Sequence, residues 1–291
     1  MEKIMLNAGN TKEYKTYTEQ VQLLRGRGLR IDDEAAATDF LKRVNYYRFS
    51  AYALTLQKHD RFYNDVSFGD VCDLYYFDYD FRKTIYAYTA FIEVALRTCV
   101  AHFHAGKYGA LGYLDASAFD NPQYHARFLA KLDDELSRSD DAFVHHHVED
   151  LNSVFPLWVA IEATSFGVSS MMFKNMHTED REDIAKRCFR YNRKYIENWL
   201  QCCVYVRNIA AHGGRFYNRD LRSCPVRLPN KHKKDIIPTR AFAFIYAIYN
   251  LLPFDTAQEQ LVSEIKTIFT NHPFALPRHM GFPDDWEKLL R

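Results

Sequence analysis

Residues 67–104 read SFGDVCDLYYFDYDFRKTIYAYTAFIEVALRTCVAHFH and form the longest stretch of helical periodicity in the chain. Ser67 is followed three residues later by Asp70, a capping-box pattern that is typical of a helix start. We therefore expect one long helix over residues 68–104, around which the rest of the chain is organised.

Helical periodicity continues on both sides of this segment, and no strand alternation outcompetes it. Eleven glycines and nine prolines in 291 residues are too few for the turns of a many-stranded fold. The sequence therefore predicts an all-α fold. Further helices are expected at 13–25, 32–45, 122–138, 157–174, 179–189, 193–212, 239–252 and 256–270.

The simplest organisation is one compact helical domain with additions at both ends. We expect an N-terminal helical extension over residues 1–66 and a helical domain over 67–270. A tail over 271–291, which contains three prolines, is expected to pack on the body of the domain.

Features of secreted, membrane-spanning and cofactor-dependent proteins are missing from the sequence. The six cysteines include no CxxC pair, which favours reduced thiols in the cytoplasm. The N-terminus lacks a signal-peptide pattern, and the longest apolar run, 241–254, is too short to span a bilayer comfortably. The run His145–His147 is expected to be a solvated loop, because three consecutive histidines cannot all face one ion. We expect no membrane contact, no cofactor and no metal site.

Positive charge is concentrated near the C-terminal third of the chain, although the net charge is only +1. Between Arg207 and Arg240 there are nine Arg or Lys residues and two Asp residues. Such a segment can bind an anionic partner such as RNA. Lysines 231, 233 and 234 fit equally well in a solvated loop that only maintains solubility.

The last turn of the predicted helix 193–212 contains the densest polar cluster in an otherwise apolar segment. A helical wheel places Arg207 near the buried stripe, and Asn208 and His212 together on the opposite side. A half-buried arginine needs a carboxylate, a carbonyl or a phosphate. Glu93 and Glu162 are the candidate carboxylates within the protein.

The spacing of Arg207 and His212 leaves two interpretations open. A histidine near a helix end is often only a cap, and a half-buried arginine is often part of a structural ion pair. An Arg-x4-His pattern arises about once by chance in a chain of this composition. A second instance, Arg97 to His102, lacks the following asparagine and the glycine stop, and we expect it to be structural.

Several blocks of sequence resemble the abortive-infection (Abi) family, which is related to the AbiD and AbiF proteins. The segment VRNIAAHGGRFYNRDL at 206–221 is similar to that family's signature. Further blocks occur in the expected order, so that the resemblance extends from about residue 23 to residue 219. They are LLRGRGLRIDDEAAATDFLKRVNYYRFSAY, VCDLYYFDYDFRKTI, FIEVALRT and PLWVAIEATSFGVSSMM.

The Abi family in turn resembles the HEPN superfamily, whose helical domains often form dimers and use an Arg-x4–6-His motif as a ribonuclease site. Arg207, Asn208 and His212 match that motif position by position. Gly213 stands where many members have a second His or a Tyr, which removes a polar side chain and leaves the pair intact. The resemblance implies a HEPN-like helical bundle, a homodimer and an antitoxin that is either RNA or protein.

The glycine stop at 213–214 is followed by residues that could bind RNA next to this motif. Arg215, Asn218 and Arg219 could contact flanking phosphates. Phe216 or Tyr217 could stack on a base, or could equally well pack the loop down.

The leading hypothesis is a metal-independent endoribonuclease of phage defence, with Arg207 stabilising the phosphate and His212 transferring protons. Two other hypotheses remain. One is a helical module that binds RNA or nucleotides without cleaving them, and the other is a scaffold that recognises a phage protein.

Overall fold

The computed structural model describes residues 13–290. Over this range the chain forms thirteen α-helices and one hairpin of two very short strands. The predicted all-α fold is confirmed. The expectation about a signal peptide concerns residues 1–12, which lie outside the described range.

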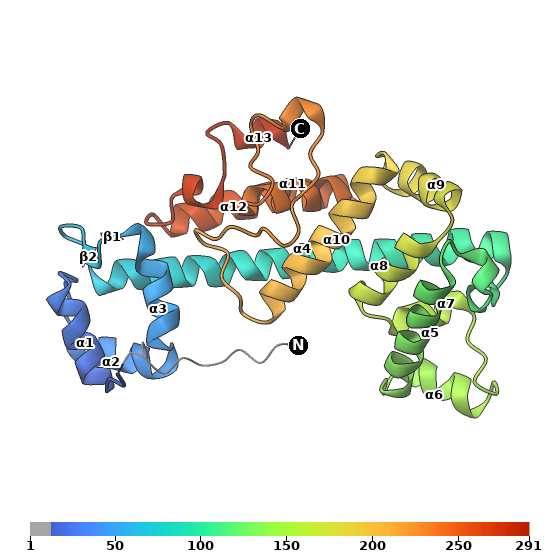
Figure 1. Ribbon diagram of the computed structural model, residues 1–291, viewed down its shortest axis with the longest axis horizontal. Helices are drawn as coiled ribbons and strands as arrows, with labels where there is room; N and C mark the ends of the chain where they lie inside the picture. Colours follow the sequence, from blue (N-terminus) through green and yellow to red (C-terminus); the bar gives the residue numbers. More distant parts are fainter. Residues whose placement is uncertain (1–12, 291) are drawn as a thin grey trace. The chain divides into compact units, whose positions relative to one another are not determined.

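The described chain divides into two compact units, one ending at Tyr76 and one beginning at Phe77. The division falls within α4 (Phe68–Tyr108), the long helix that the sequence predicts over 68–104 (Figure 1).

The first unit consists of short helices, with aromatic residues at its core. Its other elements are α1 (Tyr17–Gly26), α2 (Glu34–Arg43), α3 (Tyr46–Tyr52), the 3₁₀ turn η2 (Ala53–Thr55), β1 (Gln57–Lys58) and β2 (Arg61–Phe62). The side chain of Thr16 accepts the Glu19 amide while the Glu19 carboxylate accepts the Thr16 amide, which starts α1 with a capping box. α1 packs on α2, and the rings of Phe49 and Phe68 stack with centroids 4.6 Å apart. α3 and the hairpin were not predicted.

The second unit contains the remaining helices. They are α5 (Pro122–Ser137), α6 (Ala142–Glu149), α7 (Leu157–Ala160), α8 (Phe166–Asn175), α9 (Thr178–Cys188), α10 (Arg193–Ala211), α11 (Ala241–Leu251), α12 (Asp255–Asn271) and α13 (Trp286–Leu289). Five 3₁₀ turns connect them: η3 (Gly112–Leu114), η4 (Ala116–Ala118), η5 (Ile161–Ala163), η6 (Asn230–His232) and η7 (Pro277–Met280). α10 packs against α8, α9 and α11 (Figure 1).

α11 lies in the core of this unit, as its apolar sequence predicts. Nearly all of its residues are buried, and Phe242 contacts Phe282 and Trp286 of the C-terminal segment at ring distances of 4.9 and 6.3 Å. No helix within residues 13–290 combines the length and the apolar character needed to cross a bilayer.

The expectation of a single helix over 157–174 is wrong. The chain turns at Thr164 and Ser165, which separates η5 from α8. The Thr164 hydroxyl donates to the Ile161 carbonyl at 2.6 Å. The Ser165 amide donates to the Glu135 carboxylate of α5 at 2.8 Å, in place of a carbonyl one turn earlier. The backbone groups released by the break are therefore satisfied by side chains.

Candidate functional site

α10 carries the predicted polar cluster at its C-terminal end. The Asn192 side chain accepts the Lys194 amide at 3.1 Å and starts the helix. Ile196, Trp199 and Val206 lie on its fully buried face, as the helical wheel predicts. Because this face is fixed in the core, the orientation of the last turn is fixed as well.

A glycine pair ends α10 and determines where His212 lies. The Gly214 amide donates to the Ile209 carbonyl at 2.7 Å, and the Gly213 amide donates to the Ala210 carbonyl at 3.1 Å. These two bonds form a Schellman motif, which needs a left-handed residue, and Gly213 has φ of 65°. His212 is the exposed residue directly before the turn. The glycine at position 213 is thus a requirement of the helix end.

Arg207 lies one turn before this end, against α4. Its side chain is half-buried, and its guanidinium carbon lies 5.5 Å from the centre of the Tyr86 ring. One N–H group donates to Asn208 Oδ1 at 3.4 Å. Within residues 13–290, no carboxylate forms an ion pair with Arg207. Its charge therefore contacts an aromatic ring and a neutral amide, and the guanidinium is able to bind a phosphate.

Glu93 and Glu162 are bound to a different arginine, so the expectation that they pair with Arg207 is wrong. Arg97 lies 2.6 Å from Glu93, one turn away on the same face of α4, and 3.6 Å from Glu162. Arg97 also donates to the carbonyl of Thr164. The arginine of the second Arg-x4-His pattern is therefore structural, as expected.

The loop after the glycine pair is held by a buried carboxylate. Asp78 of α4 accepts the amides of Phe216 and Tyr217 at 2.8 and 2.7 Å, and it also forms a buried ion pair with Arg82. The rings of Phe216 and Tyr217 are 1% and 0% exposed. The suggestion that they stack on a base is therefore wrong, and the alternative that they pack the loop down is confirmed.

The three predicted phosphate-contacting residues lie around this loop, and all are half-buried. Arg215 Nη1 donates to the Tyr217 carbonyl at 3.0 Å, and Arg219 Nη1 donates to the Arg215 carbonyl at 3.2 Å. Asn218 has φ of 47° and accepts a hydrogen bond from Arg240 at 3.3 Å. All three side chains are thus hydrogen-bonded within the protein, and the two arginines lie directly after the end of α10.

Further along, the chain returns to run beside α10. The Asn198 side chain accepts the Arg227 amide at 2.6 Å, and the Trp199 indole donates to the Arg227 carbonyl at 2.8 Å. The Sγ atoms of Cys202 and Cys224 lie 3.4 Å apart. Hydrogen bonding from Cys202 lowers the pKa of the Cys224 thiol. These contacts hold the chain at Cys224 and Arg227 against α10. The loop that follows the end of α10 is therefore anchored to that helix at both of its ends.

A model of the Abi-like protein family matches residues 39–218 of this chain. The chain belongs to the Abi-like protein family. The match covers more than half of the chain and includes Arg207, Asn208 and His212. No curated protein and no solved structure matches it. The resemblance seen in the sequence blocks is thus confirmed at the level of the family.

The three consecutive histidines of this Abi-like protein lie on α6. The expectation that they form a loop is therefore wrong. His146 Nδ1 lies 2.8 Å from the Asp150 carboxylate, and His147 Nδ1 lies 2.8 Å from the Phe143 carbonyl. Among residues 13–290, no group of three or more His, Cys, Asp or Glu side chains is placed to hold a metal ion.

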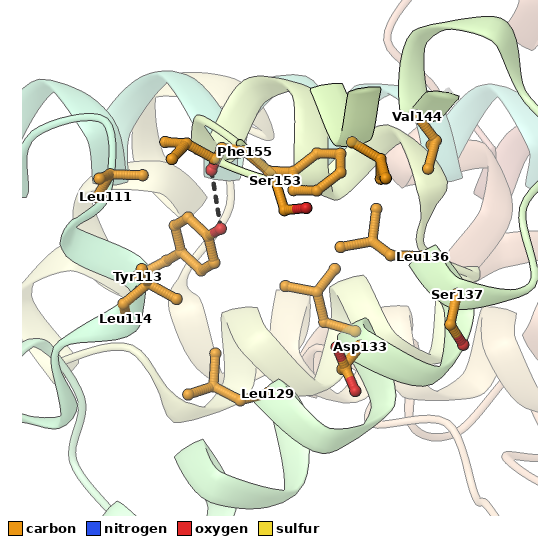
Figure 2. Close-up of a pocket in the computed structure, with 13 residues that line it drawn as sticks. Leu111, Tyr113, Leu114, Leu129, Asp133, Leu136, Ser137, Val144, Ser153 and Phe155 are labelled. Atoms are coloured by element: carbon orange, nitrogen blue, oxygen red, sulfur yellow. Dashed lines mark hydrogen bonds between the residues drawn. The ribbon is translucent and has the colours of Figure 1, made fainter. Parts of the chain in front are cut away.

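A separate apolar groove of the Abi-like protein lies between α5 and α6 (Figure 2). The side chains that point into it are mainly Leu and Val, with Asp133 and Ser137 on the α5 side. The groove contains none of the residues that match the Arg-x4-His motif. It therefore offers a surface for binding and no evident chemistry.

Proposed function

We propose that this Abi-like protein is an endoribonuclease of abortive infection that cleaves RNA without a metal ion, using Arg207 and His212. Membership of the family implies a role in abortive infection, a defence against phage. The observation that carries the proposal is the position of Arg207, which is half-buried, pairs with no carboxylate in residues 13–290 and lies one turn from an exposed histidine. An arginine in this setting is suited to a phosphate ligand.

RNA supplies its own nucleophile, the 2′-hydroxyl. Cleavage then needs a proton acceptor, a proton donor to the 5′-oxygen that leaves, and positive charge beside the phosphorane-like transition state. Imidazole is the side chain that exchanges protons near neutral pH, and His212 is exposed to solvent. The guanidinium of Arg207 would hold the phosphate through two N–H groups, and Arg215 and Arg219 would contact the neighbouring phosphates.

The exposed face of α4 next to this site supports a homodimer, which we include in the proposal. Ala87, Ala90, Phe91 and Val94 follow helical spacing and are exposed. They line an apolar groove of about 640 Å³. The groove starts next to Tyr86 and extends along α4 toward its C-terminal half. A contiguous apolar face of this kind is normally covered by another protein surface. Two copies would supply two histidines, one as the acid and one as the base.

Cleavage of a fluorogenic single-stranded RNA in the presence of EDTA tests the catalytic proposal. Arg207→Ala and His212→Ala should each lower the rate by about 10²-fold or more, and the products of the wild-type protein should carry 2′,3′-cyclic phosphates. The matched control is His102→Ala, which removes an exposed histidine from the second Arg-x4-His pattern and should leave the rate unchanged.

The proposal fails if His212→Ala cleaves RNA as fast as the wild-type protein does. RNA binding with no cleavage by the wild-type protein under any condition would favour a module that only binds RNA. An antitoxin, RNA or protein, would be recognised as a co-purifying molecule whose removal restores cleavage.

Sedimentation of Val94→Asp tests the dimer separately. This substitution introduces a charge on a side chain that is 54% exposed, so it should leave the fold intact, convert the dimer to a monomer and abolish cleavage. A monomeric wild-type protein with full activity would overturn the dimer and leave the assignment of Arg207 and His212 standing.

A further inference from the structure

The groove between α5 and α6 is built from apolar side chains of four segments (Figure 2). α5 contributes three leucines, α6 contributes two valines, and the rest come from the turn after α4 and from the chain before α7. Its volume is about 520 Å³.

Tyr113, a polar residue within the groove, is already hydrogen-bonded within the protein. The hydroxyl of Tyr113 donates to the Phe155 carbonyl at 2.8 Å, the bond drawn in Figure 2. The Tyr113 carbonyl in turn lies 2.8 Å from Nε2 of the buried His125. Apart from Asp133, Ser137 and Ser153, the lining is apolar or already hydrogen-bonded, so the face of an occupant that enters the groove has to be mainly apolar.

The mouth of the groove leaves large apolar side chains in contact with water. Leu114, Val148 and Val154 are 51%, 50% and 47% exposed, and Leu111 is 42% exposed. They belong to one groove and are not scattered over the surface. A contiguous patch of this kind marks a protein-binding site more often than it marks plain surface.

The segment that contains α5 and α6 from Leu129 onward is rich in acidic residues, and one of them, Asp133, lines the groove. Residues 129–155 contain seven acidic residues and two basic ones. Of the two basic residues, Arg138 is paired with Asp134 of the same helix. Asp133 lies on the wall of the groove and forms no ion pair within residues 13–290. The groove therefore repels RNA and favours a partner with positive charge beside its apolar face.

We propose that this groove binds a basic amphipathic helix of a partner protein. Leu, Ile or Val side chains spaced three and four residues apart would enter between α5 and α6, and flanking Lys or Arg side chains would meet Asp133 and the acidic ends of α6. α5 is 16 residues long, so a helix of about three to four turns would match the length of the groove. This inference stands on the groove alone and does not depend on the proposed ribonuclease activity.

A labelled peptide of about four helical turns, made only of Leu and Lys with Leu on one face, is the probe. Fluorescence anisotropy with the full chain should show saturable binding that weakens as the salt concentration rises. Val148→Trp fills the mouth of the groove at a side chain that is half exposed, and should weaken binding by about tenfold or more. Asp133→Asn should weaken binding severalfold and reduce its dependence on salt.

Two controls make the outcome decisive. Ile237→Trp places the same ring at a side chain that is 56% exposed outside the groove, and should bind the peptide like the wild-type protein. The matching Leu and Glu peptide should not bind. Equal binding of the two peptides, or wild-type affinity in Val148→Trp, overturns the proposal. A change in the sedimentation of the protein itself in Val148→Trp would show that a second copy covers the groove, and would also overturn it.

Discussion

The guanidinium of Arg207 on α10 lies over the ring of Tyr86 on α4, with 5.5 Å between the guanidinium carbon and the ring centre. Tyr86 is 47% exposed, so the pair lies at the surface and the arginine remains accessible. A cation–π contact at an exposed site contributes about 0.5–1 kcal/mol. We infer that Tyr86 is a positioning residue for Arg207.

Replacing Tyr86 tests that role. Tyr86→Leu retains much of the side-chain bulk and removes the aromatic face, so RNA cleavage should fall by about two- to fivefold. Tyr86→Phe keeps the face and should retain the wild-type rate. The melting temperatures of the two variants are measured as well. A general loss of stability would lower the melting temperature of a variant together with its cleavage rate. Equal rates in the Leu and Phe variants would contradict a positioning role.

Gly214 is required by close packing at the end of α10. A Cβ atom there would lie 2.7 Å from Ile209 Cγ2 and 3.1 Å from the Ile209 carbonyl oxygen. Gly214→Ala should therefore reduce the free energy of unfolding by about 1–3 kcal/mol, measured in urea. Gly106→Ala is the matched control: it lies within α4 with nothing within 4 Å of the added atom, and should be stabilising by up to about 1 kcal/mol. Equal stabilities of the two variants would refute this account.

Local signals in the sequence were sufficient to place most helices. The helix expected at 193–212 is α10, Arg193–Ala211, because an apolar stripe and a glycine pair define both its buried face and its end. α6 was missed since its eight residues include three histidines in a row and show little helical periodicity. The break at Ser165 was missed because the group that accepts its amide, the Glu135 carboxylate, is 30 residues away.

The polar cluster at the end of α10 was predictable from the sequence, and its contacts were not. Arg207, Asn208 and His212 stand out within one helix turn, so their positions follow from the sequence. The i,i+4 spacing of Glu93 and Arg97 along α4 was visible in the sequence, whereas the contact of Arg207 with Tyr86 depends on which face of α4 meets α10. Spacing along one helix does not contain that information. The same applies to the bond between Asp78 and Phe216, which joins residues 138 positions apart.

Asp78 is the residue whose loss should loosen the loop beside the site. Asp78→Ala removes the buried ion pair with Arg82 and takes away the acceptor of two backbone amides, so the free energy of unfolding should fall by about 3–5 kcal/mol. The loop should also be cut faster by a protease at 213–222. Asp134→Ala is the control, because that carboxylate is 63% exposed and pairs with the exposed Arg138 of the same helix, so its loss should change stability by less than about 1 kcal/mol.

A double variant separates the two consequences of losing Asp78. Arg82→Leu in the Asp78→Ala background removes the buried positive charge that Asp78 neutralises in the wild-type protein. It should recover part of the stability, while the loop stays sensitive to the protease. No recovery would show that the ion pair contributes little and that the backbone amides of Phe216 and Tyr217 account for the loss.

His104 makes the fold sensitive to acid. Its side chain is fully buried on α4, with ring centroids 4.8 Å from Tyr108 and 5.1 Å from Phe119. Burial lowers the pKa of His104 from 6.5 to about 4. Its neutral form is therefore the one that the folded protein accommodates.

The unfolded chain binds a proton at His104 below about pH 6.5, whereas the folded protein resists it down to about pH 4. The contribution of His104 to stability is thus fully present above that window, and it is lost as the pH falls through it, by about 3 kcal/mol in total. His104→Phe should give a shallower fall in the free energy of unfolding, measured in urea between pH 6.5 and 4.5. His102→Gln, at an exposed histidine of the same helix, should follow the wild-type curve. If the free energy of unfolding of His104→Phe depends on pH as the wild-type value does, the acid sensitivity arises at other groups. A group changes the slope of stability against pH only when its pKa differs between the folded and unfolded states.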